Sequence, residues 1–297
     1  MIRLAVSGEE GLWQAVSARL RGSTVERFDP QNGLPPADSF DALLITTWPT
    51  AEATRLQECL ASKPVLISAD CWLSQFASIR NVADRLAESP NLSIANIDHH
   101  LPSRQLIQQQ IAAGKLGAPG LIRIHRWQGT DESITSPDGT LAPLVLDVEL
   151  AGWLAGAEPE LIYATEASGA DDGPPAQRVI QVHLGFPGGA MALIDYVNAL
   201  PTGDGYQSLS VIGGAGAVYA DDHRNVQLLY RGGPAIALPV GEELRQWTSV
   251  AQEFADAVRA GAAFSPATNM SSRLTTIAAA VQQSLASRQA VNMTRKS

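Results

Sequence analysis

Short apolar runs alternate with helix-like patterns through the first 120 residues, and no other feature of the sequence constrains the fold as strongly. The expected strands are Ile2–Ser7, Thr24–Asp29, Asp41–Thr47, Pro64–Ser68 and Leu92–Asn96. The helical patterns are Gly11–Leu20, Thr50–Ala61, Leu73–Ala87 and Ser103–Ala113, the last closed by Gly114. Strands joined by crossover helices form βαβ units, so we expect a parallel, doubly wound sheet.

The pattern changes after Leu121–Trp127, whose Trp127 we expect in the core. Gln128–Pro143 is rich in turn-forming residues and predicts a loop. A helix is expected at Leu144–Ala155 and a strand at Leu161–Ala167. The polar segment Ser168–Pro175 that follows predicts an exposed loop.

Up to five strand signals then follow without helices between them. They are Arg178–Gly185, Ala190–Val197, Tyr206–Ile212, Ala217–Ala220 and Val226–Tyr230. Such a meander implies an antiparallel sheet. Two helices, Glu242–Ala260 and Asn269–Ser287, come next, and Asn292–Ser297 is expected to fray. We therefore expect an α/β chain with two domains: residues 1–120, doubly wound, and residues 121–297, an α+β domain with an open-faced, mainly antiparallel sheet.

Composition excludes several classes of protein. The 297 residues are 45% hydrophobic and 17% charged, which argues against disorder as the main state. A net charge of −9 disfavours a nucleic-acid partner, because phosphate neutralisation needs a basic face. No apolar run reaches the roughly 18 residues of a membrane span, and Met1–Leu12 does not resemble a signal peptide. Cys59 and Cys71 form no disulfide framework, so we expect a cytoplasmic location.

Five strings occur in one order along nearly the whole chain. They are Asp41–Pro49, Ile107–Gly117, Asp147–Gly156, Ile212–Val218 and Glu253–Gly261, the last followed by Pro266. This ordered set resembles the glucose-fructose oxidoreductase/inositol dehydrogenase family (Gfo/Idh/MocA). The resemblance implies a Rossmann-like first domain, an open-faced second sheet, and NAD or NADP as cofactor for hydride transfer with a sugar or polyol.

The resemblance also implies catalytic groups that this chain replaces. The family carries a lysine in a Glu-Lys-Pro turn after the fourth strand, where Ser68, Ala69 and Asp70 stand here. It usually carries a histidine, with an aspartate three positions on, where Leu146 and Glu149 stand here. Either Asp70 serves as a base, or the ordinary dehydrogenase chemistry is absent, because a carboxylate supplies no positive charge for a developing alkoxide.

The positions of the lysines in the sequence also indicate that a catalytic lysine is absent. The chain has Lys63, Lys115 and Lys296 only. Lys63 precedes its strand, whereas ligands of open α/β sheets bind outside the carboxyl ends of the strands. Lys115 lies in the turn that leaves the first domain, and Lys296 lies in the tail. None is expected where it would polarise a substrate hydroxyl.

The cofactor fingerprint is altered too. Gly8 and Gly11 do not have the Gly-x-Gly-x-x-Gly spacing. Glu9 and Glu10 either oppose a diphosphate or are favourable first-turn charges of the next helix. Asp29 either binds the ribose or caps its own turn. Trp48 either lines the cofactor cleft or packs against a helix. The cofactor-binding candidates are Ser7, Gly8, Asp29, Thr47 and Trp48.

Three further residues are candidate replacements in catalysis: Asp70, His99 and Glu149. Asp98-His99-His100 follows the fifth strand and either binds a polar ligand, relays protons or forms an ordinary loop. A metal there would need more ligands, such as His125 or Glu149, and we expect none. Asp147 diverges from Glu149 by about 200° on the helix, so we expect Asp147 to cap or to face solvent.

Apolar runs in the second sheet, such as Ala190–Ile194 and Ala235–Leu238, predict a face that needs covering. We expect a homodimer or higher homo-oligomer through this sheet, as the resemblance also implies. Three functions stay open. The chain is a binding, regulatory or partner subunit that has lost hydride transfer; a divergent NAD(P)-dependent oxidoreductase; or a lyase or epimerase that uses the same cleft.

Overall fold

The computed structural model describes residues 1–49, 53–74, 86, 89–129, 142–167, 178–201, 205–221, 226–230, 236–239, 243–262, 264 and 270–293. Contacts divide the chain into two compact units. The first unit is Met1–His100 with Glu242–Thr275, and the second is Leu101–Gly241 with Thr276–Ser297. The expected domain limits at residue 120 stay a prediction, because contacts within one chain do not test where an independently folding domain ends.

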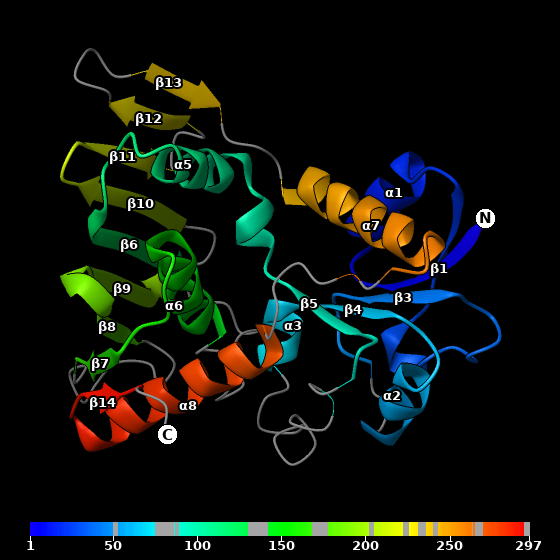
Figure 1. Cartoon of the computed structure of the whole chain (residues 1–297). Coiled ribbons are helices and arrows are strands. Elements are labelled where there is room, and N and C mark those ends of the chain that lie inside the picture. Colours follow the sequence, from blue (N-terminus) through cyan, green and yellow to red (C-terminus); the bar gives the residue numbers. More distant parts are fainter. Residues whose placement is uncertain are drawn as a thin grey trace. The chain divides into compact units, whose positions relative to one another are not determined.

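The first unit contains the parallel sheet expected from the sequence (Figure 1). Its described strands are β1 (Ile2–Ser7), β2 (Ser23–Arg27), β3 (Ala42–Ile45), β4 (Val65–Ser68) and β5 (Leu92–Ala95). They lie in the order β2-β1-β3-β4-β5, and every pair is parallel. The helices are α1 (Glu10–Arg19), α2 (Ala53–Leu60), α3 (Ala69–Ser74) and α7 (Glu243–Arg259), with short 3-10 turns η1 (Pro30–Asn32) and η2 (Ile97–His100).

Helix α7 completes the core of the first unit, although it follows the second sheet in the sequence. Trp247, Val250, Ala251 and Phe254 recur at helical spacing and are buried in one cluster with residues of β1 and α1. Figure 1 shows α7 lying beside α1. The sequence predicted a helix at Glu242–Ala260, but not that it packs in the first unit.

The second unit contains a mixed, mainly antiparallel sheet. Its described strands are β6 (Pro119–Gly129), β7 (Leu161–Glu166), β8 (Val179–Gly185), β9 (Met191–Leu200), β10 (Gly205–Gly213), β11 (Gly216–Asp221), β12 (Val226–Tyr230), β13 (Ile236–Pro239) and β14 (Val291–Asn292). Their order is β13-β12-β11-β10-β6-β9-β8-β7-β14, and among the described pairs β6 and β9 are parallel while the others are antiparallel. The α/β fold class predicted from the sequence is confirmed.

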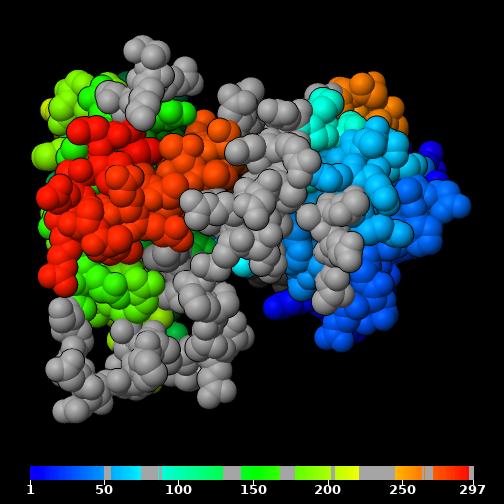
Figure 2. Space-filling model, turned by 90° about the horizontal axis from the view of Figure 1, so that it is seen from below, coloured from blue at the N-terminus to red at the C-terminus, as the bar shows by residue number. Residues whose placement is uncertain are grey.

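Helices cover one face of this sheet (Figure 1). They are α5 (Pro102–Ala112), α6 (Ala142–Ala155) and the part of α8 (Met270–Ser287) that belongs to this unit. Ser284 on α8 accepts a 2.8 Å hydrogen bond from the Ala164 amide of β7. Figure 2 shows that α8 forms part of the outer surface of the unit. Gly114, with φ of +69°, ends α5 as predicted.

Side chains alternate across the second sheet, as the pleat of a strand requires. In β6, Ile122 and Ile124 face the helices and are buried, while Arg123 and Trp127 face the other side. The expectation that Trp127 lies in the core is therefore wrong, because a strand of this sheet is buried on one side only. Within the described residues, no helix is long and apolar enough to span a membrane.

The carboxyl-terminal residues differ from the expectation. Asn292 was expected to fray, but it pairs with Leu161 as part of β14, because the edge of β7 offers backbone partners that a two-residue strand can use. The greater part of the helix expected at Leu73–Ala87 lies outside the described residues, as do the loops expected within Gln128–Pro143 and at Ser168–Pro175.

Candidate functional site

The carboxyl edge of the parallel sheet is the first candidate site, since ligands of open α/β sheets bind there. Ser7 ends β1, and Thr46, Thr47 and Trp48 follow β3. The Ser7 hydroxyl donates to the Thr47 carbonyl at 2.7 Å, and the Thr46 hydroxyl donates to the Ser7 carbonyl at 2.8 Å. These crossed bonds fix the two strand ends against each other. Thr47 is exposed and Trp48 half-buried at this edge.

Gly8 is required at the turn from β1 into α1. A Cβ at this position would overlap Thr46 Oγ1 and approach Leu12 Cδ2 to 3.1 Å, so a side chain does not fit. The turn also carries a positive charge, because Arg27 at the end of β2 donates to the Gly8 carbonyl at 3.4 Å. The sequence analysis missed Arg27. Its position at the carboxyl end of β2 was the available signal.

The amino end of α1 opens at this turn. Glu9 occupies the N-cap position without a side-chain capping bond, so its carboxylate does not satisfy the first amides of the helix. Glu10 instead accepts a 3.0 Å bond from Gln14. Both glutamates are exposed, and two exposed like charges about 4 Å apart cost only about 1 kcal/mol in water. Their charge therefore does not exclude an anion at the helix end.

Asp29 caps the turn that it opens. Its carboxylate accepts hydrogen bonds from the Gln31 amide at 2.9 Å and from the Asn32 side chain at 3.3 Å. Of the two alternatives from the sequence, the capping role is the one visible in these bonds. A role in binding ribose stays a prediction, because a carboxylate that accepts these bonds has further lone pairs.

Two of the catalytic candidates follow β4 and β5 in the same unit. Asp70 is exposed in the first turn of α3, directly after β4. His99 lies in η2, which follows β5, where the Asp98 amide donates to the Asn96 side chain at 3.1 Å. Burial, and then the charge of His99, lower the pKa of His100. We therefore expect His100 to be neutral near pH 7.

The second unit holds a buried polar group at the end of its sheet. Asp147 on α6 is fully buried and pairs with Arg126 of β6 through two bonds of 2.7 Å. The expectation that Asp147 caps or faces solvent is therefore wrong. Helix α6 is buried on nearly every side, so a carboxylate on it is stable only when it is paired. The apolar residues around Asp147 and Glu149 in the sequence were the signal for this burial. Glu149 is buried on the same helix.

Tyr196 lies beside this ion pair. Its side chain is fully buried, yet its hydroxyl makes no hydrogen bond with any residue that the structure describes. Burial raises the pKa of Tyr196, although the charges of Arg126 and Arg178 oppose the shift. A buried hydroxyl without a partner is costly, so this atom is a candidate for contact with a ligand or an ordered water.

A second ion pair borders the same sheet end. Arg178 binds Glu166 through bonds of 2.6 and 2.9 Å, and its amide donates to Asn198 at 2.5 Å. The structure thus brings Arg126, Asp147 and Tyr196 together in the second unit. It places Ser7, Gly8, Thr47 and Trp48 together in the first. Among the described residues, no group of three or more His, Cys, Asp or Glu side chains could hold a metal ion.

Solved structures of several known proteins share this fold. A myo-inositol dehydrogenase from Corynebacterium glutamicum superposes with a TM-score of 0.74 and 15% identity, over 99% of each chain. The fold is that of the inositol dehydrogenases. A scyllo-inositol dehydrogenase from Lactobacillus casei, solved with bound NAD(H) and scyllo-inositol, gives a TM-score of 0.73 at 14% identity, over 98% of this chain and 99% of that chain. These matches confirm the fold implied by the sequence resemblance.

The inositol dehydrogenase fold also occurs in proteins with other ligands. An oxidoreductase from Agrobacterium radiobacter in complex with NAD⁺, L-tartaric acid and magnesium gives a TM-score of 0.75 at 13% identity, over 98% of each chain. Comparison by sequence finds neither a matching family model nor a matching curated protein. The structural similarities show the fold of this chain and not its function.

Proposed function

We propose that the chain is a divergent NAD(P)-dependent oxidoreductase that acts on a hydroxyl of a sugar- or polyol-like substrate. The observation that carries the proposal is the turn from β1 into α1. It combines a glycine without room for a side chain, a helix end without a side-chain cap, and the guanidinium of Arg27. A diphosphate is the ligand that such a helix end favours.

The residues of the first unit fit a dinucleotide. The first amides of α1 and Arg27 would hold the diphosphate, and Ser7, Thr47 and Trp48 would border the rest of the cofactor. The bound nicotinamide would supply the hydride acceptor or donor. Similar structures solved with NAD(H) or NAD⁺ support this assignment.

The residues of the second unit suit a substrate with several hydroxyl groups. Arg126 donates, Asp147 accepts, and the Tyr196 hydroxyl can do either. In this proposal Tyr196 gains its missing hydrogen bond from a substrate hydroxyl. We propose Glu149, on the same helix as Asp147, as the group that holds the proton leaving that hydroxyl, while catalytic roles for Asp70 and His99 in the first unit stay predictions.

A titration of the whole chain with NADH and NADPH tests the cofactor assignment. We expect a dissociation constant of about micromolar order for one of them, measured by calorimetry or by nicotinamide fluorescence. Arg27→Gln should weaken binding by about tenfold, since it removes one charge near the diphosphate. Arg55→Gln is the matched control, because Arg55 is an exposed arginine on α2. Absence of binding at about millimolar cofactor would contradict the proposal.

A second function, a binding or partner subunit without hydride transfer, is favoured by the positions of the lysines. Lys63 precedes β4, and its ammonium lies 5.9 Å from the ring centre of Phe40. Lys115 lies between α5 and β6. Neither of these two lysines of the described chain is at a carboxyl end of the parallel strands. Cofactor binding without turnover of any polyol would support this second function.

A further inference from the structure

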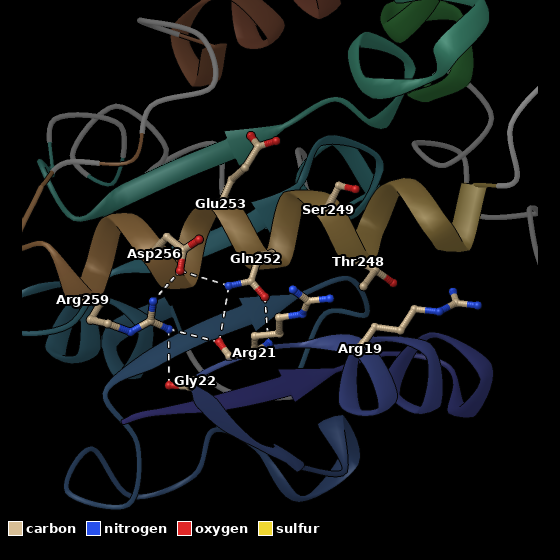
Figure 3. Close-up of a pocket in the computed structure, with 9 residues that line it drawn as sticks. All are labelled: Arg19, Arg21, Gly22, Thr248, Ser249, Gln252, Glu253, Asp256 and Arg259. Carbon is tan, nitrogen blue, oxygen red and sulfur yellow. Dashed lines mark hydrogen bonds and ion pairs between the residues drawn. The ribbon is translucent and has the colours of Figure 1, made fainter.

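A pocket of about 670 Å³ lies in the first unit, away from the proposed cofactor site (Figure 3). It is formed by the end of α1, the turn into β2 and the outer face of α7. Its lining residues are Arg19, Arg21, Gly22, Thr248, Ser249, Gln252, Glu253, Asp256 and Arg259. Gly22 directly precedes β2, so the pocket is at the amino ends of the parallel strands. Ser7 and Gly8 are at the carboxyl ends.

One wall of the pocket is held by hydrogen bonds between α7 and the turn. The Gln252 side chain accepts from the Arg21 amide at 2.8 Å and donates to Asp256 at 3.0 Å. Arg259 donates to the carbonyls of Arg21 and Gly22 at 3.2 and 3.3 Å. Gly22 has a φ of +68°, and a Cβ there would lie only 3.0 Å from Arg259 Nη2. The backbone of the turn is therefore fixed against α7.

The charged residues that line the pocket are an ion pair, the separate carboxylate of Glu253 and two further arginines. Arg259 and Asp256 form an ion pair. The side chains of Arg19 and Arg21 are exposed and have no hydrogen bond or ion pair within the part of the chain that the structure describes. Figure 3 shows both on the side of α7 that carries Thr248, with Ser249 and Glu253 on the opposite side of the helix. Two free guanidinium groups thus share one pocket of a chain whose net charge is −9.

We propose that this pocket binds a phosphorylated sugar or polyol, with its phosphate on Arg19 and Arg21. A phosphate dianion matches two guanidinium groups in charge, and each planar guanidinium can bind it through two hydrogen bonds. The volume exceeds the need of inorganic phosphate and falls within the range of small-molecule sites. The hydroxyl of Thr248, on the same side of α7 as the two arginines, suits a sugar hydroxyl.

Calorimetry on the whole chain tests this site with glucose 6-phosphate, glucose and inorganic phosphate as probes. Glucose 6-phosphate is expected to bind with a dissociation constant of about millimolar order or tighter, and more weakly as salt rises, because the arginines are exposed. Glucose is expected not to bind. Inorganic phosphate is expected to bind about tenfold more weakly than glucose 6-phosphate, since it lacks the hydroxyl contacts.

Substitutions test whether Arg19 and Arg21 bind the phosphate. The double variant Arg19→Gln with Arg21→Gln should lose at least about tenfold in affinity for glucose 6-phosphate. Arg245→Gln is the matched control, because Arg245 is exposed on α7 but does not line the pocket. Circular dichroism and the NADH titration of each variant show whether folding and the carboxyl-edge site are intact. No binding of glucose 6-phosphate at about 10 mM, or equal binding by the double variant, overturns the site. Equal affinity for inorganic phosphate overturns the sugar part of the assignment.

Discussion

At the scale of single residues, a contact from a neighbouring strand determines which glycine can be replaced. Gly8 and Gly11 both flank the start of α1, yet only Gly8 faces a neighbour that a Cβ would overlap. The sequence predicted that Gly8 borders the cofactor edge. The reason it must be glycine, the hydroxyl of Thr46, comes from β3 and was not visible in the local pattern.

Gly8→Ala should destabilise the chain by about 1–3 kcal/mol, because the added methyl group collides with Thr46. Gly11→Ala is the control, since a Cβ there meets nothing within 4 Å. That substitution lies in the first turn of a helix and should be neutral or stabilising by up to about 1 kcal/mol. Urea unfolding measures both. Equal stability of the two variants would contradict the packing at Gly8.

Asp147→Ala leaves the Arg126 guanidinium without its buried partner, so we expect a loss of about 3–5 kcal/mol. Glu166→Ala breaks a more exposed pair with Arg178 and should cost about 1 kcal/mol or less. Thermal and urea unfolding distinguish the two losses. A cost for Asp147→Ala no greater than that for Glu166→Ala would show that the first pair contributes little.

Acid should lower the free energy of unfolding through protonation of Asp41 in a narrow pH range. Hydrogen bonds from the Arg3 side chain and amide lower the pKa of Asp41 from 3.8 to about 2. Because the pKa in the folded state is the lower one, this contribution is present above about pH 4 and is lost as the pH falls to about 2. The pair is about one-third exposed or more, so the effect is small. In Asp41→Asn, unfolding followed by circular dichroism should show a shallower loss of stability over this range, and an unchanged slope would contradict the assignment.

At the scale of elements, the sequence predicted strands and helices better than it predicted their partners. β1 and β12 have the predicted limits, and the alternation of strands with helices correctly indicated a parallel sheet. The helix at α7 was predicted, but its place in the first unit was not, because a helical pattern does not identify the surface that the helix covers. The Arg126–Asp147 pair was missed for a related reason: it joins a strand to a helix across the core.

Phe254→Ala should show how much α7 contributes to the first unit. Phe254 is buried among residues of the core cluster, so we expect a loss of about 3–5 kcal/mol. Glu253→Ala, at the neighbouring exposed position, should stay within about 0.5 kcal/mol of the parent chain. Chemical unfolding monitored by tryptophan fluorescence suits this pair, since Trp247 lies in the same cluster. A small effect of Phe254→Ala would mean that α7 is dispensable for the core.

At the scale of the whole molecule, the face of the second sheet opposite its helices carries exposed apolar side chains among the described residues. Trp127, Val179, Met191 and Tyr219 are 39%, 46%, 57% and 39% exposed on that face. Arg123 and Asp195 lie on the same face, so the face carries charges of both signs and suits a second copy of itself. We propose a homodimer through this face, which needs about 800 Å² from each partner.

A double substitution, Trp127→Glu with Met191→Glu, should convert the dimer to a monomer in sedimentation or light-scattering experiments. Both positions are exposed, so the monomer should keep its fold. Glu9→Lys with Glu10→Lys, which changes charge on the first unit, is the control for non-specific effects and should leave the dimer intact. A parent chain that sediments as a monomer at all concentrations would contradict the proposed interface.

In the function that we propose, this chain transfers hydride between a pyridine nucleotide and a polyol. The most direct test follows the near-ultraviolet absorbance of reduced nicotinamide while the chain is incubated with NAD⁺ or NADP⁺ and a panel of inositols, sugars and sugar alcohols. We expect the absorbance of reduced nicotinamide to rise with one class of polyol only. The rise should be lost in Tyr196→Phe, whose fold should stay intact. Tight binding of the nucleotide with no absorbance change for any member of the panel would contradict this function.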